Sequence, residues 1–211
     1  MSKNLGVNFR KSIISFAWTW MGLLIFIGII SLFSIWSMNR TFNNGAQLAF
    51  KTSALKNEIS SASIAFKVQI QEWKNILLRG KNNSDRDIYY SKFEQQENSV
   101  QASLIHAYAM CSQLGLNEVC NKVSTVQLQH QQLGAAYKKN LIHASLENYD
   151  AIHSVDQNVK GMDRDLEKSM SNLNVIFSDI ELKQHNETHQ KLTEKYTTLR
   201  KLILSILAIA L

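Results

Sequence analysis

The sequence contains no proline and only eight glycines in 211 residues. Proline interrupts a helix because it lacks the backbone N–H and its ring clashes with the preceding turn, so its absence favours long uninterrupted helices. Cysteine is also scarce: the two present, Cys111 and Cys120, match neither the C-x-x-C redox motif nor a zinc-binding pattern. The composition thus favours a helical chain and argues against a redox or metal role for its cysteines.

The sequence also lacks the patterns that carry catalysis or nucleic-acid binding. No serine, cysteine or histidine constellation suggests a nucleophile, and no glycine-rich phosphate loop follows a strand. The net charge of +6 comes from lysines and arginines that are spread along the chain and do not alternate with aromatic residues. This distribution favours solvated helix faces over a nucleic-acid surface. We expect no enzymatic activity, no cofactor and no nucleic-acid partner.

The histidines that might suggest a metal site have simpler interpretations. His185 and His189 are four residues apart, so a helix places both rings on one face, but the order HNETH differs from the zinc-protease motif H-E-x-x-H. A solvated polar face is favoured there over a metal site. His130 lies among apolar residues at helical spacing and is predicted to be a hydrogen-bonded core histidine. We expect no bound metal.

One long apolar run lies near the amino terminus. Residues 13–37 carry no charge, and about 20 residues at 1.5 Å of rise each suffice to cross the hydrocarbon core of a bilayer. The run is longer than the apolar part of a signal peptide, and no A-x-A site follows before Arg40, which favours a retained anchor over a cleaved signal. A second apolar run, residues 202–211, reaches the end of the chain.

Basic residues predict the orientation of the first run. Lys3, Arg10 and Lys11 precede it closely, and the positive-inside rule keeps such a terminus in the cytoplasm. The residues after the run then lie outside the inner membrane. Arg200 and Lys201 lie on the disfavoured side, but a long translocated domain weakens this constraint.

Between the two runs, apolar residues recur at steps of three and four, which is the spacing of one helix face. The segments that show this pattern are residues 55–77, 89–111, 119–141 and 162–180. Four amphipathic helices with short turns bury these faces against one another as an antiparallel up-down bundle. We therefore predict an all-α, membrane-anchored four-helix bundle with long helices.

Turn-forming residues separate the four predicted helices. Residues 80–84 are predicted to form the first turn, with Ser84 as the helix cap. Gly115 is predicted to take the left-handed conformation that ends a helix, with Asn117 capping the next one. The third break is placed within residues 147–159.

These boundaries divide the chain into four parts. They are a cytoplasmic terminus (1–11), a first transmembrane helix (12–38), a periplasmic four-helix bundle (39–201) and the start of a second transmembrane helix (202–211). The first bundle helix runs for about 40 residues, or roughly 60 Å, and the second is shorter. The turn at Gly80 and the connection near Asp150 are therefore predicted to lie at the tip of the bundle, far from the membrane.

Cys111 and Cys120 flank the Gly115 turn almost symmetrically on neighbouring predicted helices. In an oxidising periplasm a disulfide between them would stabilise the fold by about 2–3 kcal/mol on the loop-entropy model. The alternative is two unpaired, small apolar residues, since Cys111 lies on an apolar stripe. We favour the disulfide.

The predicted tip gathers arginines and aromatic residues. Arg79 ends the first bundle helix, Arg86 opens the second and Arg164 opens the fourth, with Trp73 and Tyr137 predicted at the height of Arg164. Arginine binds carboxylates through two parallel hydrogen bonds, and aromatic rings supply a rigid apolar wall. These five residues form the candidate site for a small anion. The alternative is that the arginines pair with nearby carboxylates, namely Glu72, Asp85, Asp163 and Asp165.

Three strings carry a resemblance to a known family. QEWKNILLRG (71–80), preceded by FKVQ (66–69), resembles a segment of the periplasmic sensor domains of bacterial methyl-accepting chemotaxis proteins of the four-helix-bundle type. The pattern H-x-x-L-G-x-x-Y (130–137) supports it. VKGMDR (159–164) is similar to the V-x-G-x-D-R that these domains often carry.

The resemblance implies a dimeric receptor in the bacterial inner membrane. Ligand binding in such receptors shifts the last periplasmic helix slightly, and the shift passes through the second membrane helix to a HAMP linker and a hairpin that controls a histidine kinase. None of these output parts is present in the chain as given, so the kinase and its adaptor are partners only through a missing cytoplasmic region. The family's ligand-contact residues are not fixed by the three strings, and Trp73, Arg79, Tyr137 and Arg164 are carried over as candidates.

Three hypotheses follow. The leading one is the sensory half of a chemoreceptor for a small periplasmic solute, such as an organic acid or an amino acid. A second keeps the sensor but joins it to a histidine kinase or a diguanylate cyclase. A third is a structural, membrane-anchored helical protein that binds no ligand.

Overall fold

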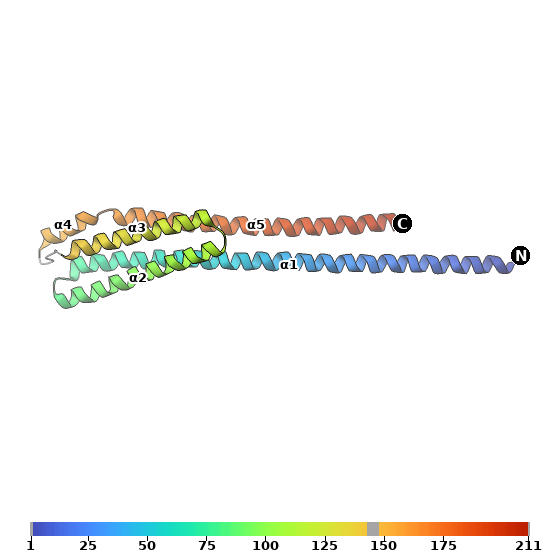
Figure 1. Cartoon of the computed structure of the whole chain (residues 1–211), viewed down its shortest axis with the longest axis horizontal. Coiled ribbons are helices and arrows are strands. Elements are labelled where there is room, and N and C mark those ends of the chain that lie inside the picture. The colour runs from blue at the N-terminus through green and yellow to red at the C-terminus, as the bar shows by residue number, and fades with distance from the viewer. Residues whose placement is uncertain (1, 143–147, 211) are drawn as a thin grey trace. The chain divides into compact units, whose positions relative to one another are not determined.

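The described part of the chain is helical. A computed structural model describes residues 2–142 and 148–210, and the side chains of residues 11–142 and 148–209. The helices are α1 (Ser2–Arg79), α2 (Asn83–Gln113), α3 (Asn117–Ile142), α4 (Tyr149–Val159) and α5 (Met162–Ala210) (Figure 1). No strand occurs within these residues, so the prediction of an all-helical chain is confirmed.

The chain divides into two compact units. One is Ala49–Leu182, called here the central unit. The other, called the terminal unit, combines the part of α1 up to Leu48 with the part of α5 from Lys183 onward. Two helices, α1 and α5, therefore contribute to both units.

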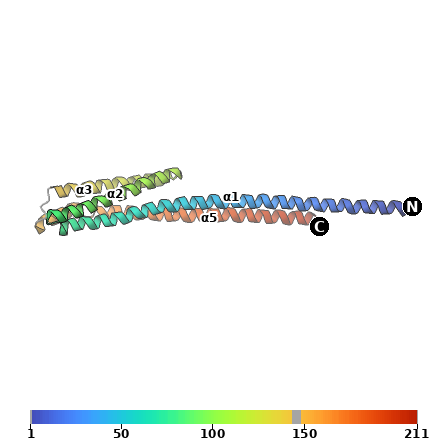
Figure 2. The same cartoon turned by 90° about the horizontal axis from the view of Figure 1, so that it is seen from below.

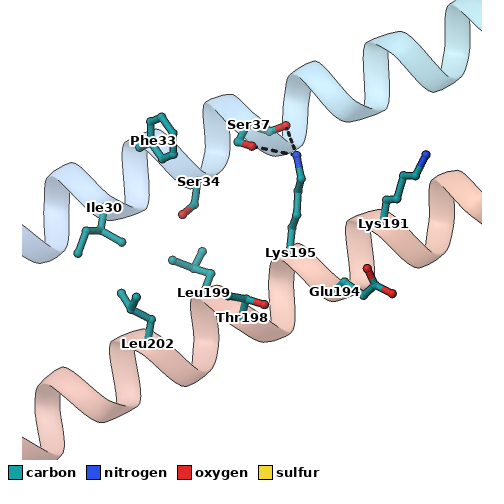
Figure 3. A pocket seen from close by; sticks show the side chains of 10 residues that line it. All are labelled: Ile30, Phe33, Ser34, Ser37, Lys191, Glu194, Lys195, Thr198, Leu199 and Leu202. Atoms are coloured by element: carbon teal, nitrogen blue, oxygen red, sulfur yellow. Dashed lines mark hydrogen bonds between the residues drawn. The ribbon is translucent and has the colours of Figure 1, made fainter.

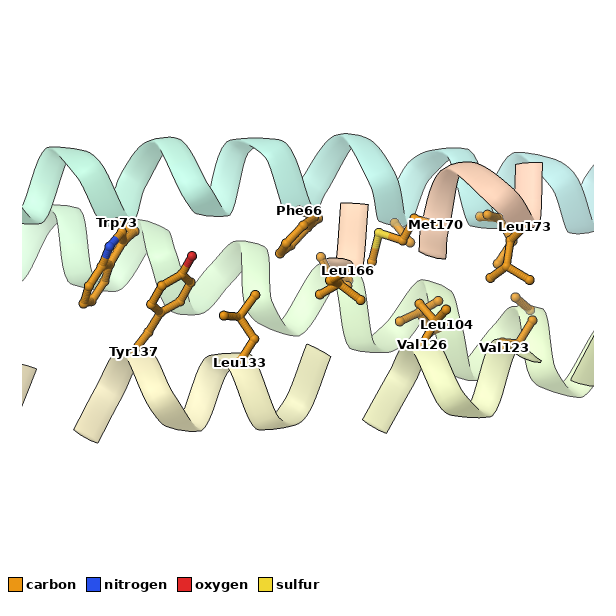
Figure 4. Close-up of a cluster of buried hydrophobic side chains, with 14 of the residues drawn as sticks. Phe66, Trp73, Leu104, Val123, Val126, Leu133, Tyr137, Leu166, Met170 and Leu173 are labelled. Carbon is orange, nitrogen blue, oxygen red and sulfur yellow. The ribbon is translucent and has the colours of Figure 1, made fainter. Parts of the chain in front are cut away.

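The central unit has one hydrophobic core, to which all five helices contribute. The four predicted apolar stripes supply most of it, and α2 and α3 lie side by side in both views (Figures 1 and 2). Figure 4 shows Phe66, Leu133 and Leu166, from three helices, directed into the same interior. The largest completely buried side chains are Trp73, Tyr137, Phe66, Phe93 and Phe177. Removal of this apolar surface from water is the main source of stability for such a unit.

The turn between α1 and α2 is capped differently from the prediction. Asn82, in an extended conformation, is the cap: its side-chain oxygen accepts a hydrogen bond from the Asp85 N–H at 2.8 Å. Ser84 lies inside the first turn of α2, so its predicted role as cap is wrong. Asparagine and serine both satisfy the free N–H groups of a helix start, and the backbone geometry decides between them.

The turn between α2 and α3 is centred on Gly115. Its φ of 70° is left-handed, as predicted, and glycine adopts it without steric cost. Asn117 is the first residue of α3 and not its cap, because the Leu116 carbonyl already accepts the Cys120 N–H at 2.9 Å. The helix therefore begins one residue earlier than the predicted cap requires.

An additional helix occupies the predicted third break. Residues 143–147 lie outside the described residues, and α4 follows them, capped by Asn148, whose side chain accepts the Ala151 N–H at 2.8 Å. The break itself lies at Lys160 and Gly161, where Gly161 has a φ of 84°. Val155 and Val159 of α4 are buried, so this short helix belongs to the core. The prediction of four helices missed α4 because a helix of eleven residues has only a short apolar pattern.

The terminal unit has a different surface. Many of its apolar side chains are exposed, including Ile29 (59%), Leu32 (70%) and Phe33 (64%). Among the described helices, α1 is the one long and apolar enough, over Lys11–Arg79, to cross a membrane by length and composition, a test that a signal sequence also passes. α1 continues without interruption through the predicted boundary between residues 38 and 39.

Candidate functional site

The two aromatic residues of the predicted tip site belong to the core. Trp73 and Tyr137 stack with ring centroids 4.3 Å apart, and Phe93 contacts Tyr137 edge-on at 5.9 Å. Each of the stacked side chains is only 2% exposed. They meet as the sequence predicted, but they pack on each other and on Phe93 and expose almost no surface to a ligand.

Burial also sets the polar chemistry of this aromatic pair. Desolvation raises the pKa of the Tyr137 phenol, and Asp163 and Asp156 raise it further, so the hydroxyl stays neutral. The Trp73 Nε1–H is buried and has no hydrogen-bond partner among the described residues. A buried donor without a partner costs free energy, so the pair is held in place by packing.

The three predicted arginines lie in different surroundings. Arg79 is exposed at the end of α1, and Arg86 donates to the Asn83 side-chain oxygen at 2.8 Å. Arg164 lines a groove with Ser63 and Lys67, six or more residues from Trp73 along α1. Residues 74–78 of α1 share the lining of another pocket with Tyr149, Ile152, His153 and Asp156 of α4. That Arg164 stands at the height of Trp73 stays a prediction.

The alternative in which the arginines are paired is not seen either. Within the described side chains, none of Arg79, Arg86 and Arg164 forms an ion pair. Two of the expected carboxylates accept hydrogen bonds from asparagines instead: Asp85 from Asn82 and Glu72 from Asn75. The guanidinium of Arg164 is thus available to an anion.

The groove around Arg164 is the candidate site, called here the cationic groove. It lies between α1 and α5 of the central unit and has a volume of about 420 Å³. Its lining residues are Ser63, Phe66, Lys67, Arg164, Glu167, Lys168, Met170, Ser171, Asn172 and Asn174. Three cations and one carboxylate give the lining a net charge of +2 (3 − 1).

The polar residues of the cationic groove are held by hydrogen bonds across the two helices. Asn174 accepts from Ser60 at 3.1 Å and donates to Ser63 at 3.4 Å. Glu167 lies 3.4 Å from the Lys67 nitrogen, an exposed pair of small energetic weight. Arg164 and Lys168 remain without a carboxylate partner among the described residues, so the groove suits a small anion, with a guanidinium fork as its directional contact.

Sequence reasoning missed Lys67 and Lys168. Arg164 and Lys168 are four residues apart, so their common helix face could have been read from the sequence. Lys67 could not, because its place beside Arg164 depends on how α1 packs against α5. The described residues contain no group of three or more His, Cys, Asp or Glu that could hold a metal ion.

A buried histidine links two glutamines by hydrogen bonds in the central unit. His130 is completely buried, and its Nε2–H donates to the Gln69 oxygen at 2.7 Å while its Nδ1 accepts from Gln101 at 2.5 Å. Burial, and to a smaller extent the charge of Lys138, lowers the pKa of His130 to about 4. The neutral ring satisfies both contacts, so the prediction of a hydrogen-bonded core histidine is confirmed.

A disulfide joins Cys111, at the end of α2, to Cys120, at the start of α3. The two Cα atoms are 5.7 Å apart, within the usual range for such a bond. It closes the Gly115 turn and links the two helices at this end of the central unit.

Comparison with known proteins places the chain near one class of receptor. No family model matches the chain, and no solved structure matches it. The methyl-accepting chemotaxis protein CtpH of Pseudomonas aeruginosa is 34% identical to it over 115 residues. The chain is thus similar to a chemotaxis receptor. The match covers 54% of the chain but only 19% of that receptor, and it supports a role related to chemoreception.

Proposed function

We propose that the chain is the ligand-sensing part of a transmembrane chemoreceptor. In this proposal the central unit is an antiparallel up-down bundle in the periplasm, and a small anion such as an organic acid or an amino acid binds in the cationic groove. The similarity to a methyl-accepting chemotaxis protein supports the class of receptor. The observation that carries the site is the groove itself, where Arg164 and Lys168 face an anion-sized space without carboxylate partners.

The apolar terminal unit supports membrane anchoring. Residues 12–38 of α1 would cross the inner membrane, and residues 202–211 would begin a second crossing. Side chains such as Leu32 and Phe33 remain 70% and 64% exposed within the described chain, and lipid would cover them. Residues 39–201 would then form the periplasmic sensor domain, and residues 1–11 the cytoplasmic terminus.

One helix connects the proposed site to the proposed membrane segment. α5 carries Arg164 and Lys168 near its start and the apolar residues from Leu202 onward near its end. A helix without proline moves as a unit, so an anion that draws Arg164 toward α1 would shift α5 by an ångström or two. In a homodimer this shift would reach a cytoplasmic output region and its kinase and adaptor.

The experiment compares two arginines. The full chain is purified in detergent, and its melting temperature is measured against a panel of small carboxylates and inorganic anions. A ligand selective for the folded state adds about 2.7 kcal/mol to the free energy of unfolding at 100 times its Kd, and the melting temperature rises as a result. Arg164→Ala should abolish the rise, whereas Arg79→Ala, an equal loss of charge outside the groove, should retain it.

The opposite result for the two arginine variants would place the anion site at the predicted tip of the bundle. A rise lost in Arg79→Ala and kept in Arg164→Ala would contradict the cationic groove and support the arrangement expected from the sequence. Far-ultraviolet circular dichroism of each variant shows whether helix content is unchanged. A histidine kinase or a diguanylate cyclase as output would leave both results the same, and the coding sequence after Leu211 distinguishes these outputs.

A further inference from the structure

A second groove lies in the terminal unit, between the two helices that form it. It has a volume of about 410 Å³. It is lined by Ile30, Phe33, Ser34 and Ser37 of α1 and by Lys191, Glu194, Lys195, Thr198, Leu199 and Leu202 of α5 (Figure 3). The proposed sensing function does not use this space.

The polarity of this groove changes along its length. Figure 3 shows Ile30 and Leu202 together at one end, and Ser37, Lys195 and Lys191 toward the other. The change occurs where the uncharged run of residues 13–37 stops. A membrane has the same gradient at the boundary between acyl chains and headgroups, so the two gradients coincide if residues 12–38 cross the bilayer.

Lys195 fixes the polar end of the groove. Its ammonium donates to the Ser37 carbonyl at 3.2 Å, to the Ser37 hydroxyl at 2.9 Å and to the Thr41 hydroxyl at 2.6 Å. All three partners are uncharged, so these bonds hold the side chain while leaving its charge in place.

The charge of the polar end is not balanced. Among the described side chains, neither Lys191 nor Lys195 has an ion-pair partner. Glu194, the one carboxylate in the lining, accepts a hydrogen bond from Gln190 at 2.8 Å. The lining therefore has a net charge of +1 (2 − 1) next to hydroxyl groups of Ser34 and Thr198, which suits an anionic headgroup.

The apolar end leads toward a second apolar cavity between the same helices. That cavity, of about 510 Å³, is lined by Phe16, Thr19, Trp20, Leu23, Phe26, Ile206 and Ile209. From Ser37 to Phe26 the helix rises about 16 Å, close to the thickness of one leaflet of a roughly 30 Å hydrocarbon core. One acyl chain can follow this length while its headgroup stays beside Lys191.

We propose that the terminal unit binds one anionic phospholipid, with its phosphate beside Lys191 and Lys195 and an acyl chain along Ile30 and Leu202. The proposal rests on the membrane anchoring included in the proposed function. A zwitterionic lipid gains less from the uncompensated lysines, because its own ammonium opposes them. The lipid would fill the space between α1 and α5 on the side of the membrane where the sensor domain lies.

The test uses the full chain in nanodiscs of phosphatidylcholine that contain a minor fraction of phosphatidylglycerol. Native mass spectrometry of the released protein counts the retained lipids. Phosphatidylglycerol should be enriched over its bulk fraction, and Lys191→Gln should reduce the enrichment roughly fivefold. Lys201→Gln removes the same charge from an exposed position outside the groove and should leave the enrichment unchanged.

A steric pair tests the acyl chain independently of charge. Ile30→Trp fills the groove and should lower lipid retention, whereas Ile29→Trp, at a position exposed outside it, should not. Displacement of the lipid by excess glycerol 3-phosphate would assign the polar end to a soluble anion and overturn the proposal.

Three further results would overturn it. They are no enrichment at all, equal loss in Lys191→Gln and Lys201→Gln, and efficient disulfide-linked dimers of Ile30→Cys, which would seat a second copy in the groove. Failure of the chain to enter nanodiscs would overturn membrane anchoring together with this inference. Entry without enrichment would overturn this inference alone.

Discussion

The same helix, α1, meets two different surroundings in the central and terminal units. In the central unit its apolar residues are covered by protein: Leu55 and Ile59 are completely buried. In the terminal unit residues of the same kind are exposed, with Leu32 at 70% and Trp36 at 57%. Leucine favours a helix in both places, so propensity does not distinguish the units. The difference lies in what covers the apolar face of the helix. Other helices cover it in the central unit and, as proposed, lipid covers it in the terminal unit.

The largest expected effect compares one leucine from each unit. Leu104→Ala removes a completely buried side chain of α2 and should lower the free energy of unfolding of the central unit by about 2–5 kcal/mol. Leu32→Ala should change it by less than about 0.5 kcal/mol, because that side chain is 70% exposed. Urea unfolding of the full chain in detergent, followed by circular dichroism, measures both. Equal losses would show that the terminal unit has a protein core of its own.

The pH dependence of the central unit should come from its buried histidine. The pKa of His130 is about 4 in the folded chain and near 6.5 in an unfolded chain, so the unfolded state takes up the proton first as the pH falls. The stability is therefore complete above about pH 6.5 and declines toward pH 4, by at most about 3 kcal/mol. Unfolding midpoints measured between pH 7.5 and 4 test this.

A matched variant isolates this ring from other titrating groups. His130→Gln keeps a polar side chain that can bond Gln69 and Gln101 but cannot titrate, so its midpoint should lose the corresponding part of the slope. An identical slope in the parent chain and the variant would rule out His130 as the source.

The disulfide should contribute a comparable or smaller amount. Reduction of the bond between Cys111 and Cys120 should lower the stability of the central unit by about 2–3 kcal/mol, because it releases a short loop in the unfolded chain. The full chain purified without reductant should show no free thiol before reduction. The double variant Cys111→Ala/Cys120→Ala should not respond to reductant, and free thiols at the outset would contradict the bond.

The fold was largely predictable because the sequence repeats its helical signals. Apolar spacing found the buried faces of α2, α3 and α5, and Gly115 marked a turn that needs a left-handed residue. Caps were less predictable, since Asn82 and Ser84 have similar chemistry and only the backbone chooses between them. α4 was missed, although Asn148 and Gly161 mark both of its ends.

The candidate site was less predictable than the fold. The height of a residue, counted from the end of its helix, also depends on where the neighbouring helices begin, and α4 was absent from the prediction for Arg164. Trp73 and Tyr137 were correctly placed near each other, but periodicity shows only that a residue faces a partner helix. It does not show whether an open space remains beside the two rings; here they stack directly on each other, and Phe93 packs against both.

The smallest effect on stability should accompany a clear effect on binding, in the exposed cationic groove. Lys67 and Glu167 are 65% and 52% exposed, so breaking their pair should change the free energy of unfolding by less than about 1 kcal/mol. Lys67→Ala removes a cation from the lining and leaves Glu167 unopposed, so anion affinity should fall. Glu167→Gln removes the one anion and should raise it severalfold. Calorimetric titration with a ligand from the panel measures both variants, and changes of the same sign would contradict electrostatic binding there. Opposite signs at nearly constant stability would distinguish the buried residues that stabilise the central unit from the exposed residues proposed to bind the ligand.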